Sequence, residues 1–340
     1  MRRDLYFFPM AFPDLDFSGN ALLDPALRAK YQALQARLRG LKSVLIGFSG
    51  GVDSTLLTAL ARHVLGRPNV IACMAVGPSL AETERLEAVR LAALMDVELK
   101  PYPAKEFDNP AYVANGPDRC FHCKADLFRH LEAFAAAYAE QSLVALSPGT
   151  SADGIQGSAG GAPGSAGDFL PPAAPEHRPA LLYGGNLDDT RDYRPGRKAA
   201  ETYGALAPLA EAGLTKADVR ALSRAIGLPT ADKAAQPCLS SRIPYGSPVT
   251  VERLAAIEAG EAVLGSMGFR EYRLRHYGDT ARIEVPSDQL GLFTPDARMD
   301  LEHRLAGLGF SHLEIDSAGF RSGNLNRGLT QRQLGRFTGR

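Results

Sequence analysis

The feature that most constrains the fold is a repeated pattern of apolar run, turn and helix. An apolar run over 44–48 is followed by two glycines and then by apolar residues at helical spacing over 56–64. A second apolar run over 70–76 leads into a predicted helix over 86–93, and a third short strand is expected over 97–99. Strands that alternate with helices of this length are typical of a doubly wound, parallel α/β sheet. Such a sheet binds its ligand at the carboxyl ends of its strands.

The sharpest local motif is Ser49-Gly50-Gly51-Val52-Asp53-Ser54, between the first strand and the first helix. Its two glycines let the backbone approach an anion, its successive amides form a nest, and the positive end of the helix adds to the attraction. The motif lacks the lysine of the G-x-x-x-x-G-K-S/T loop, so it does not indicate γ-phosphate transfer. An ordinary tight turn between strand and helix is the alternative interpretation.

A C-x-x-C motif is formed by Cys120 and Cys123, between Arg119 and Lys124. Neighbouring cations lower the pKa of a thiol, so we expect these two cysteines to favour the thiolate form. The motif alone is weakly specific, because structural zinc sites, redox pairs and iron–sulfur sites all use it, and a chance pairing also produces it. No export signal precedes it, which favours thiols, metal ligands or catalysis over disulfides.

The other two cysteines differ in their surroundings. Cys73 lies within the apolar second strand and is predicted to be a buried core thiol, whereas Cys238 lies in a polar segment. A closed zinc site needs four ligands, and the sequence has no second C-x-x-C to supply them. Cys120, Cys123 and Cys238 are therefore a candidate set of three thiolates, which suits a cubane cluster with one iron left open.

Composition excludes some classes of function. The 340 residues contain 38 basic and 38 acidic side chains, so no overall positive field exists to hold a nucleic acid backbone. The apolar runs fall short of the roughly 18–20 residues that a membrane helix needs. The first apolar stretch is broken by Pro9, which is too early for a secretory signal. We therefore expect a cytoplasmic protein that does not span a membrane and does not have nucleic acid as its main partner.

Two domains are expected in a chain of this length. The first is predicted over 25–244 and the second, of α+β type, over 245–330, with tails at 1–24 and 331–340. The segment 151–178 has six glycines and four prolines in 28 residues, so it is predicted to be a flexible insertion. The remaining predicted elements are a strand over 180–183, a helix over 216–225 capped by Thr215, a helix over 251–267, strands over 271–277 and 281–285, a helix over 298–308 and a strand over 312–315.

Taken together, the motifs resemble one family. The S-G-G-x-D-S loop resembles the pyrophosphate loop (PP-loop) of the ATP pyrophosphatase superfamily, and the order of the motifs resembles the LarE family of ATP-dependent sulfur transferases, which make the nickel-pincer nucleotide cofactor. The motifs that carry the resemblance are the loop, R-C-x-x-C-K, and the segments 185–189, 192–196, 208–210, 237–246 and 319–323. The resemblance covers about residues 25–330, and the segment around Cys238 is its most specific part. Gly185 departs from the family's G-T-N-x-D-D and lacks a hydroxyl.

The resemblance implies an enzyme that cleaves ATP to AMP and pyrophosphate on a PP-loop fold. Its implied ATP-binding residues are Ser49, Gly50, Gly51, Asp53 and Ser54, with Asp53 acting through Mg²⁺. The implied substrate is a small nucleotide, pyridinium-3,5-biscarboxylic acid mononucleotide, whose carboxylates are adenylated and then converted to thiocarboxylates. The implied substrate-binding residues are Asn186, Asp189, Arg191, Arg194, Arg242 and Arg275. Solvated charge clusters or a solvent-facing strand are the alternative interpretation of these arginines.

The resemblance leaves two sulfur routes open. In one branch of the family the cysteine at the position of Cys238 gives up its own sulfur and becomes dehydroalanine. In the other, three cysteines hold a 4Fe-4S cluster that delivers the sulfur, and Cys120, Cys123 and Cys238 match this branch. The family also implies a homo-oligomer, a trimer or hexamer. A tRNA-thiolating PP-loop enzyme and a nucleotide-binding regulatory module with a structural metal are the competing interpretations.

Overall fold

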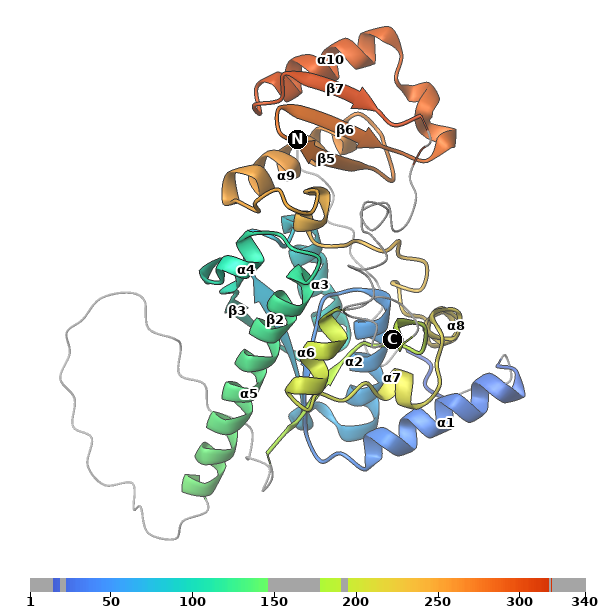
Figure 1. The fold of residues 1–340 in the computed structure, drawn as a ribbon. Coiled ribbons are helices and arrows are strands. Elements are labelled where there is room, and N and C mark those ends of the chain that lie inside the picture. The colour runs from blue at the N-terminus through green and yellow to red at the C-terminus, as the bar shows by residue number, and fades with distance from the viewer. Residues whose placement is uncertain (1–14, 19–22, 146–177, 191–194, 318, 320–340) are drawn as a thin grey trace, which may run out of the picture.

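The structure is a computed structural model, shown in Figure 1. It describes residues 15–18, 23–145, 178–190, 195–317 and 319. The predicted flexible insertion at 151–178 lies outside the described residues except for Arg178. Within the part of the chain that is described, no helix has both the length and the apolar character needed to cross a bilayer.

The central element is a four-stranded sheet in the order β3-β2-β1-β4, with every neighbouring pair parallel. Its strands are β1 Val44–Gly47, β2 Val70–Val76, β3 Glu98–Pro103 and β4 Ala180–Tyr183. The chain moves outward from β1 to β3 and then returns to the other side of β1 with β4. The boundary between β1 and β4 is thus the switch point of the sheet, where open α/β folds bind ligands.

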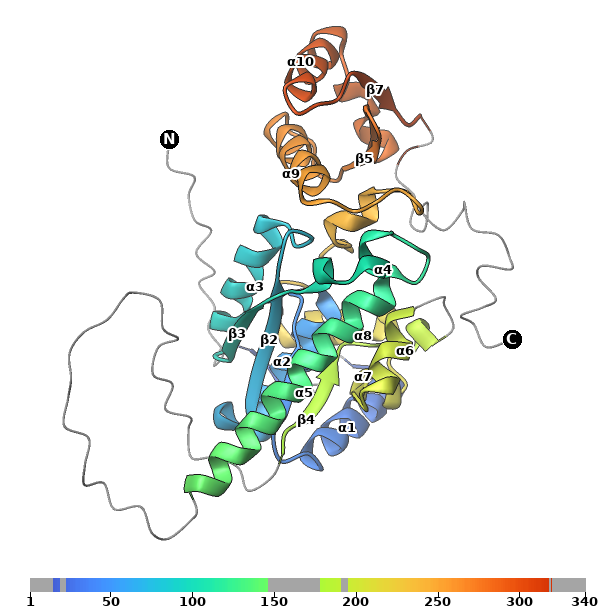
Figure 2. The same ribbon diagram turned by 60° about the vertical axis from the view of Figure 1, so that its left-hand side comes forward.

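Helices cover both faces of this sheet, as the doubly wound prediction requires (Figure 2). Val44 and Ile46 pack into one apolar cluster with helices of the first face, whereas Leu45 packs into another cluster with helices of the second face. This alternation follows from the two-residue period of a strand. The first face carries α1 Pro25–Arg39, α2 Val52–Leu65, α3 Glu82–Leu94 and α8 Lys216–Ile226, and the second carries α5 Arg119–Ala145 and α6 Pro195–Thr202.

Two helices differ from the sequence analysis. Leu86 and Val89 mark the apolar spacing of α3 in the sequence, yet each is 42% exposed, and Ala88 and Leu91 form its buried face instead. The 27-residue helix α5 was not predicted, and the C-x-x-C motif lies within its first five residues. The buried face of α3 consists of two alanines and two leucines, so the spacing of Leu86 and Val89 indicated the wrong face.

The N-terminal tail predicted over 1–24 is partly packed. Leu15 and Phe17 are buried, and the Phe17 ring stacks on His63 of α2 with centroids 4.3 Å apart. The hydroxyl of Tyr31 in α1 donates to the backbone oxygen of Phe17 at 2.9 Å. Aromatic contacts therefore hold the described residues of this segment against the first domain.

A second, smaller sheet follows in the order β5-β6-β7, in which β5 and β6 are antiparallel and β6 and β7 are parallel. Its elements are α9 Val251–Ser266, β5 Arg273–Tyr277, β6 Thr280–Glu284, α10 Pro295–Ala306 and β7 His312–Ile315. Its apolar core also takes in Tyr112 and Leu239 from earlier in the chain. The domain boundary at residue 245 stays a prediction.

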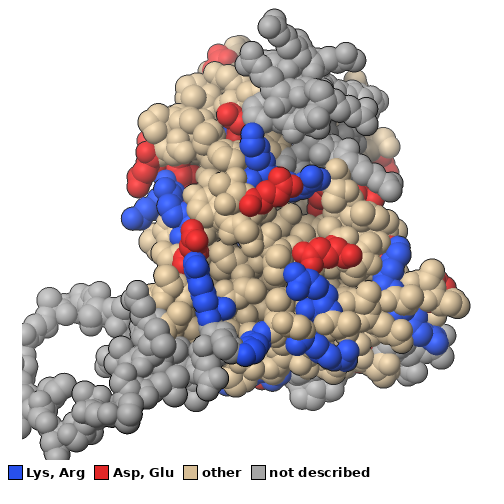
Figure 3. Space-filling model, turned by 60° about the horizontal axis from the view of Figure 1, so that its bottom comes forward, with Lys and Arg blue, Asp and Glu red and all other residues tan. Residues whose placement is uncertain are grey.

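Short helices connect these larger elements. They are η2 Arg67–Asn69, η3 Glu106–Asp108, α4 Pro110–Val113, η4 Asp188–Thr190, α7 Pro208–Glu211, η5 Leu239–Arg242 and η6 Ser287–Leu292. Two of them matter for the site, because η4 follows β4 at the switch point and η5 begins one residue after Cys238. On the face of the molecule shown in Figure 3, acidic and basic side chains are interspersed among uncharged residues, in keeping with the balanced charge.

Candidate active site

The predicted anion-binding loop lies at the carboxyl end of β1 and leads directly into α2. Gly50 has φ of +69°, and a Cβ there would lie 3.2 Å from that of Ala88, so both conformation and space favour glycine. The hydroxyl of Ser54 donates to the backbone oxygen of Gly51 at 3.1 Å, and the backbone N–H of Ser49 donates to this hydroxyl at 3.3 Å. The two serines thus order the loop from within.

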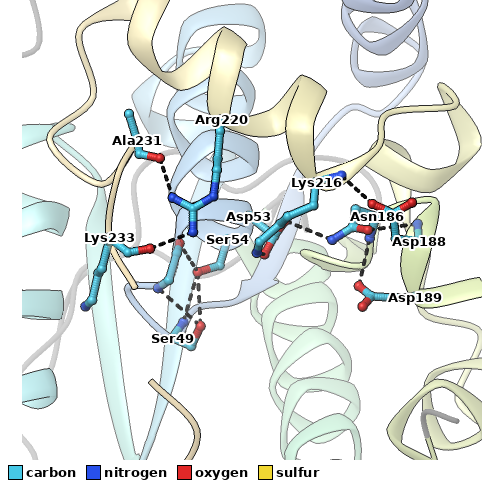
Figure 4. Close-up of polar contacts among 11 residues, drawn as sticks. Ser49, Asp53, Ser54, Asn186, Asp188, Asp189, Lys216, Arg220, Ala231 and Lys233 are labelled. Carbon is cyan, nitrogen blue, oxygen red and sulfur yellow. Dashed lines mark hydrogen bonds and ion pairs between the residues drawn. The ribbon is translucent and has the colours of Figure 1, made fainter. Parts of the chain in front are cut away.

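The carboxylate of Asp53 has a partner on each oxygen (Figure 4). Its Oδ1 accepts a hydrogen bond from Asn186 Nδ2 at 3.0 Å, and its Oδ2 forms an ion pair with the ammonium of Lys216. Asn186 follows β4, whereas Lys216 is the first residue of α8. Three elements therefore converge on one carboxylate at the switch point of the sheet.

The loop after β4 approaches the anion-binding loop closely. A Cβ on Gly184 would lie 2.8 Å from the backbone nitrogen of Ser54, a distance that real side chains do not adopt. Within the same loop, the backbone N–H of Asn186 donates to Asp189 Oδ2 at 3.1 Å, and that of Asp188 donates to Asn186 Oδ1 at 2.9 Å. Asn186 is thereby oriented toward Asp53.

Not every predicted residue of this loop is described. Arg191 and Arg194 lie outside the described residues. Gly185, which departs from the family motif, is described: a Cβ there would lie 2.5 Å from the ring of Tyr183. A residue with a side chain at this position requires the Tyr183 ring to lie elsewhere.

Two lysines border the anion-binding loop, and sequence reasoning missed both of them. Lys216 pairs with Asp53, and Lys233 lies 3.3 Å from the backbone oxygen of Gly50 while pairing with Glu84 and Glu87 of α3 at 2.7 and 2.8 Å. The available signal was the position of Lys216 in the first turn of a helix. A cation there opposes the helix dipole and calls for a nearby anion.

Arg220 of α8 holds the segment that carries Lys233. Its guanidinium donates to the backbone oxygens of Ala231 at 2.6 Å and Lys233 at 2.8 Å (Figure 4). Cys238 follows five residues after Lys233. A single short segment thus links the rim of the anion-binding loop to the predicted sulfur-bearing cysteine.

The segment that contains Cys238 is fastened to the start of α5. The guanidinium of Arg119, which is buried, donates to the backbone oxygen of Ser240 at 2.7 Å and to Asn115 Oδ1 at 2.6 Å. The Ser240 hydroxyl is 2.7 Å from the hydroxyl of Tyr112. These contacts bring residues 119–123 and 238 into the same region.

The three predicted cysteines are close enough to influence one another electrically. Burial raises the pKa of the Cys123 thiol to about 12, and the nearby Cys238 adds to this increase. Cys120 is partly exposed, but the protein atoms packed around its sulfur desolvate the thiol and raise its pKa. Arg119 lowers this pKa, and Cys238 raises it further. The expectation that the flanking cations favour thiolates is therefore wrong here, because desolvation outweighs their attraction.

The chemistry of this set suits a metal or cluster, since three sulfur donors lie in one region of the fold, near the buried guanidinium of Arg119. Among the described residues, however, no group of three or more His, Cys, Asp or Glu side chains is arranged to hold a metal ion. The three thiols of this set lie in one region, but the described residues do not form a preformed metal site. Cys73, by contrast, is a buried core thiol as predicted, and burial raises its pKa to about 12.

Three guanidinium groups gather next to the Cys238 segment. Arg242 forms a two-pronged pair with Glu261 at 2.8 and 3.1 Å and donates to the backbone oxygen of Cys238 at 3.3 Å. Arg275 pairs with Glu284 at 2.9 Å and donates to the backbone oxygen of Ser241. Both side chains thus have internal partners.

Arg273 completes this cluster. Desolvation, followed by repulsion from Arg242 and Arg275, lowers the pKa of Arg273 to about 10. The Nε of Arg275 has no hydrogen-bond partner among the described residues. The cluster therefore holds buried positive charge, contrary to the solvent-facing alternative for Arg242 and Arg275, whereas Arg282 of β6 pairs with Glu314 at the surface.

The fold and the loop define a PP-loop adenylating domain. The family model for NAD synthase matches residues 29–115, which contain β1, the anion-binding loop and α2. The chain is 33% identical over 311 residues to the pyridinium-3,5-bisthiocarboxylic acid mononucleotide synthase of Lactiplantibacillus plantarum, covering 92% of this chain and 99% of that protein. The chain belongs to the LarE family of ATP-dependent sulfur transferases, which confirms the resemblance inferred from its motifs.

Two other relatives are uncharacterized proteins. One, from Synechocystis, is 36% identical over 306 residues, covering 90% of this chain and 100% of the relative. The other, from Methanocaldococcus jannaschii, is 23% identical over 247 residues, covering 73% of this chain and 79% of the relative. The similarity to the first relative and to the synthase therefore extends across both sheets.

Proposed function

We propose that this enzyme adenylates the carboxylates of pyridinium-3,5-biscarboxylic acid mononucleotide and replaces an oxygen of each with sulfur. The observation that carries the proposal is the short segment that runs from Lys233, beside the anion-binding loop, to Cys238, beside the guanidinium cluster. An activating site and a sulfur-bearing residue thus lie along one piece of chain. The named synthase from Lactiplantibacillus plantarum supports the choice of substrate.

Activation begins with ATP bound at the loop of Ser49, Gly50, Gly51, Asp53 and Ser54. Backbone N–H groups at the start of α2 stabilise the pyrophosphate charge. A substrate carboxylate oxygen bonds to the α-phosphorus while the bond from that phosphorus to the bridging oxygen breaks, and pyrophosphate leaves. Asp53 is the residue that would hold Mg²⁺, which would neutralise phosphate charge.

The guanidinium cluster is the proposed site for the substrate's own anions. Arg242, Arg273 and Arg275 carry three positive charges against the two of Glu261 and Glu284, so an added phosphate or carboxylate offsets an excess of buried positive charge. Asn186 and Asp189, with Arg191 and Arg194, are proposed to contact the same substrate from the loop after β4. Asn186 also orients Asp53.

For the sulfur step, we propose that Cys120, Cys123 and Cys238 hold a 4Fe-4S cluster. Such a cluster supplies a sulfide at its open iron. The grouping of three cysteines beside Arg119 supports this route, since a sacrificial route needs only Cys238. In the sacrificial route the Cys238 sulfur bonds to the acyl carbon and AMP leaves. Loss of the Cα proton then breaks the Cβ–S bond, which releases the thiocarboxylate and leaves dehydroalanine.

The test of the activation step is product analysis with ATP, Mg²⁺ and the pyridinium dicarboxylate mononucleotide. We expect AMP and pyrophosphate that depend on this acceptor, and ADP with orthophosphate as main products would contradict the proposal. The Asp53→Asn variant should reduce pyrophosphate release about 100-fold or more. Asp96→Asn is the matched control, because Asp96 pairs with Arg62 and Arg67 away from the loop and asparagine tolerates its φ of +51°.

Two further expectations belong to this proposal. A tRNA-thiolating enzyme would bind tRNA at moderate salt. At about 0.15 M salt, exposed charges are screened beyond roughly 8 Å. A tRNA-binding assay at this salt concentration therefore distinguishes such an enzyme from the proposed function. We also propose a cytoplasmic homo-oligomer, a trimer or hexamer. Light scattering of the purified protein would measure its mass.

A further inference from the structure

Arg119, the first residue of α5, carries a buried positive charge that no described carboxylate neutralises. The residue is 2% exposed. Its Nη1 donates to two neutral oxygens, Asn115 Oδ1 at 2.6 Å and the backbone oxygen of Ser240 at 2.7 Å, and no ion pair joins it to an acidic side chain within the described ranges. A buried charge without an opposite charge destabilises a folded chain, so this site calls for an anion.

Two other buried guanidinium groups show how the chain usually balances such a charge. Arg242 is 3% exposed and pairs with Glu261, and Arg275 is 4% exposed and pairs with Glu284. Each of these arginines is therefore buried together with a carboxylate. Arg119 has the same degree of burial and only uncharged hydrogen-bond acceptors. The anion that balances its charge must come from a group that binds to the chain.

The groups around the Arg119 charge include thiols of the candidate cluster set. Desolvation lowers the pKa of this guanidinium, but Cys238 and Cys120, followed by two tyrosines, together raise it above its usual range. Burial raises the pKa of the Cys120 thiol, and a hydrogen bond from Arg119 acts in the opposite direction. Negative charge on these sulfurs would thus lie beside a cation that is already in place.

The first turn of α5 adds to this positive potential. Cys120 and Cys123 are its second and fifth residues, close to the helix end at which backbone amides carry partial positive charge. The buried carboxylate of Glu106 opposes this potential at Cys123, and it accepts a hydrogen bond from Ser79 Oγ at 2.6 Å rather than from Arg119. Glu106 therefore does not balance Arg119, and its charge increases the need for a cation beside any anion that the cysteines bind.

We propose that Arg119 supplies the positive charge that balances a cluster bound by Cys120, Cys123 and Cys238, and that this charge favours both reduction of the cluster and binding of hydrosulfide at its open iron. This inference rests on the proposed cluster route for sulfur delivery. Three thiolate ligands give an iron–sulfur cluster a negative charge. An electron or a hydrosulfide anion adds to that charge, and a fixed cation stabilises it. Hydrosulfide takes the place of water at the iron without a change in oxidation state, and Arg119 keeps its protons.

The experiment compares four single variants of the full chain with the wild type after anaerobic reconstitution. Arg119→Gln removes the buried charge, and Arg119→Lys keeps it. Tyr112→Phe is the structural control, because it removes the contact with Ser240 without changing the charge. Lys124→Gln is the charge control, since Lys124 is exposed and lies one turn after Cys120. Spectroelectrochemistry measures the reduction equilibrium, and titration with sodium sulfide measures the affinity for hydrosulfide.

For Arg119→Gln we expect the reduction equilibrium constant to fall about tenfold, which lowers the potential by about 59 mV, and hydrosulfide to bind about tenfold more weakly. Arg119→Lys should stay within about threefold of the wild type in both measurements, because the charge is kept. Tyr112→Phe and Lys124→Gln should also stay within about threefold, because the first removes no charge and the charge removed by the second is screened by water and salt. Wild-type values in Arg119→Gln would overturn the proposal, and so would an equal loss in Tyr112→Phe.

Iron content decides the outcome if Arg119→Gln takes up no cluster. Retention of the cluster in Arg119→Lys would then support the need for a positive charge, whereas its loss in Arg119→Lys as well would overturn the proposal. A wild type that takes up no iron would refute both the cluster route and this inference. Pyrophosphate release that depends on the pyridinium acceptor would still support the proposed adenylation, so the two failures are distinguishable.

Discussion

The guanidinium of Arg119 donates a hydrogen bond to the backbone oxygen of Ser240 at 2.7 Å, across 121 residues of sequence. Arg119 is the first residue of α5 and directly precedes Cys120, and Ser240 follows two residues after Cys238. This contact joins the helix that carries the C-x-x-C motif to the segment that carries the third cysteine. This buried side chain, together with the contact between Tyr112 and Ser240, therefore holds the two cysteine-bearing segments near each other.

Replacement of Arg119 by glutamine should weaken the contact between α5 and the segment that carries Cys238. We expect the free energy of unfolding to fall by about 3 kcal/mol, because hydrogen bonds to charged groups contribute about 1.5–3 kcal/mol each and the guanidinium makes two. Urea unfolding measures the change. Arg298→Gln is the control, since its exposed pair with Glu302 should contribute less than about 0.5 kcal/mol. Equal losses in the two variants would contradict the role of Arg119.

The three cysteines should be equally necessary for a cluster. Replacing Cys120, Cys123 or Cys238 with alanine should weaken cluster binding at least about tenfold after anaerobic reconstitution, as measured by iron and sulfide analysis. Cys73→Ala is the control, because this thiol lies in the core of the sheet. In the sacrificial route only Cys238→Ala abolishes sulfur transfer. Mass spectrometry would then show the loss of hydrogen sulfide from the wild-type peptide that holds Cys238, even under iron-replete anaerobic conditions.

The closeness of Gly184 to the anion-binding loop predicts that Gly184→Ala is harmful. Its Cβ would lie 2.8 Å from Ser54 N and 3.0 Å from the carbonyl carbon of Asp53, and backbone atoms cannot move aside cheaply. We expect a loss of about 1–3 kcal/mol in stability, as for other overpacked sites, together with reduced pyrophosphate release. Gly291→Ala is the control, since a Cβ there meets nothing within 4 Å. A fully active Gly184→Ala enzyme would show that the approach of the two loops is unimportant.

The raised pKa of Cys73 predicts a loss of stability at high pH. The thiol stays protonated in the folded chain up to about pH 12, but the unfolded chain loses this proton near the ordinary thiol pKa of 9.0. Its contribution is complete below pH 9 and falls by about 1.4 kcal/mol per pH unit as the pH rises from 9 toward 12. Unfolding of Cys73→Ala should therefore depend less steeply on pH than unfolding of the wild type. Parallel curves above pH 9 would contradict the shift.

Much of the sheet was predictable because its signals are local. The strands Val70–Val76, Ala180–Tyr183 and His312–Ile315 have the bounds that the apolar runs indicate, and α8 begins at Lys216, directly after the predicted cap Thr215. The anion-binding loop was found for the same reason, since a few adjacent residues set both its conformation and its chemistry. The burial of α3 was not predictable in this way, because its core face is built from alanines and leucines that apolar spacing did not single out.

Local sequence was enough to establish the class of the sheet, the loop at the end of its first strand and the family to which the chain belongs. The partners of the site residues, by contrast, emerge only in the folded chain. Lys216 reaches Asp53 across 163 residues, and Arg119 reaches Ser240 across 121, so neither contact has a local signal. The flanking cations, which are visible in the sequence, predict lowered pKa values for Cys120 and Cys123, but in the folded chain both values are raised. The reason is desolvation, which depends on every atom that packs around a sulfur and therefore on the tertiary structure.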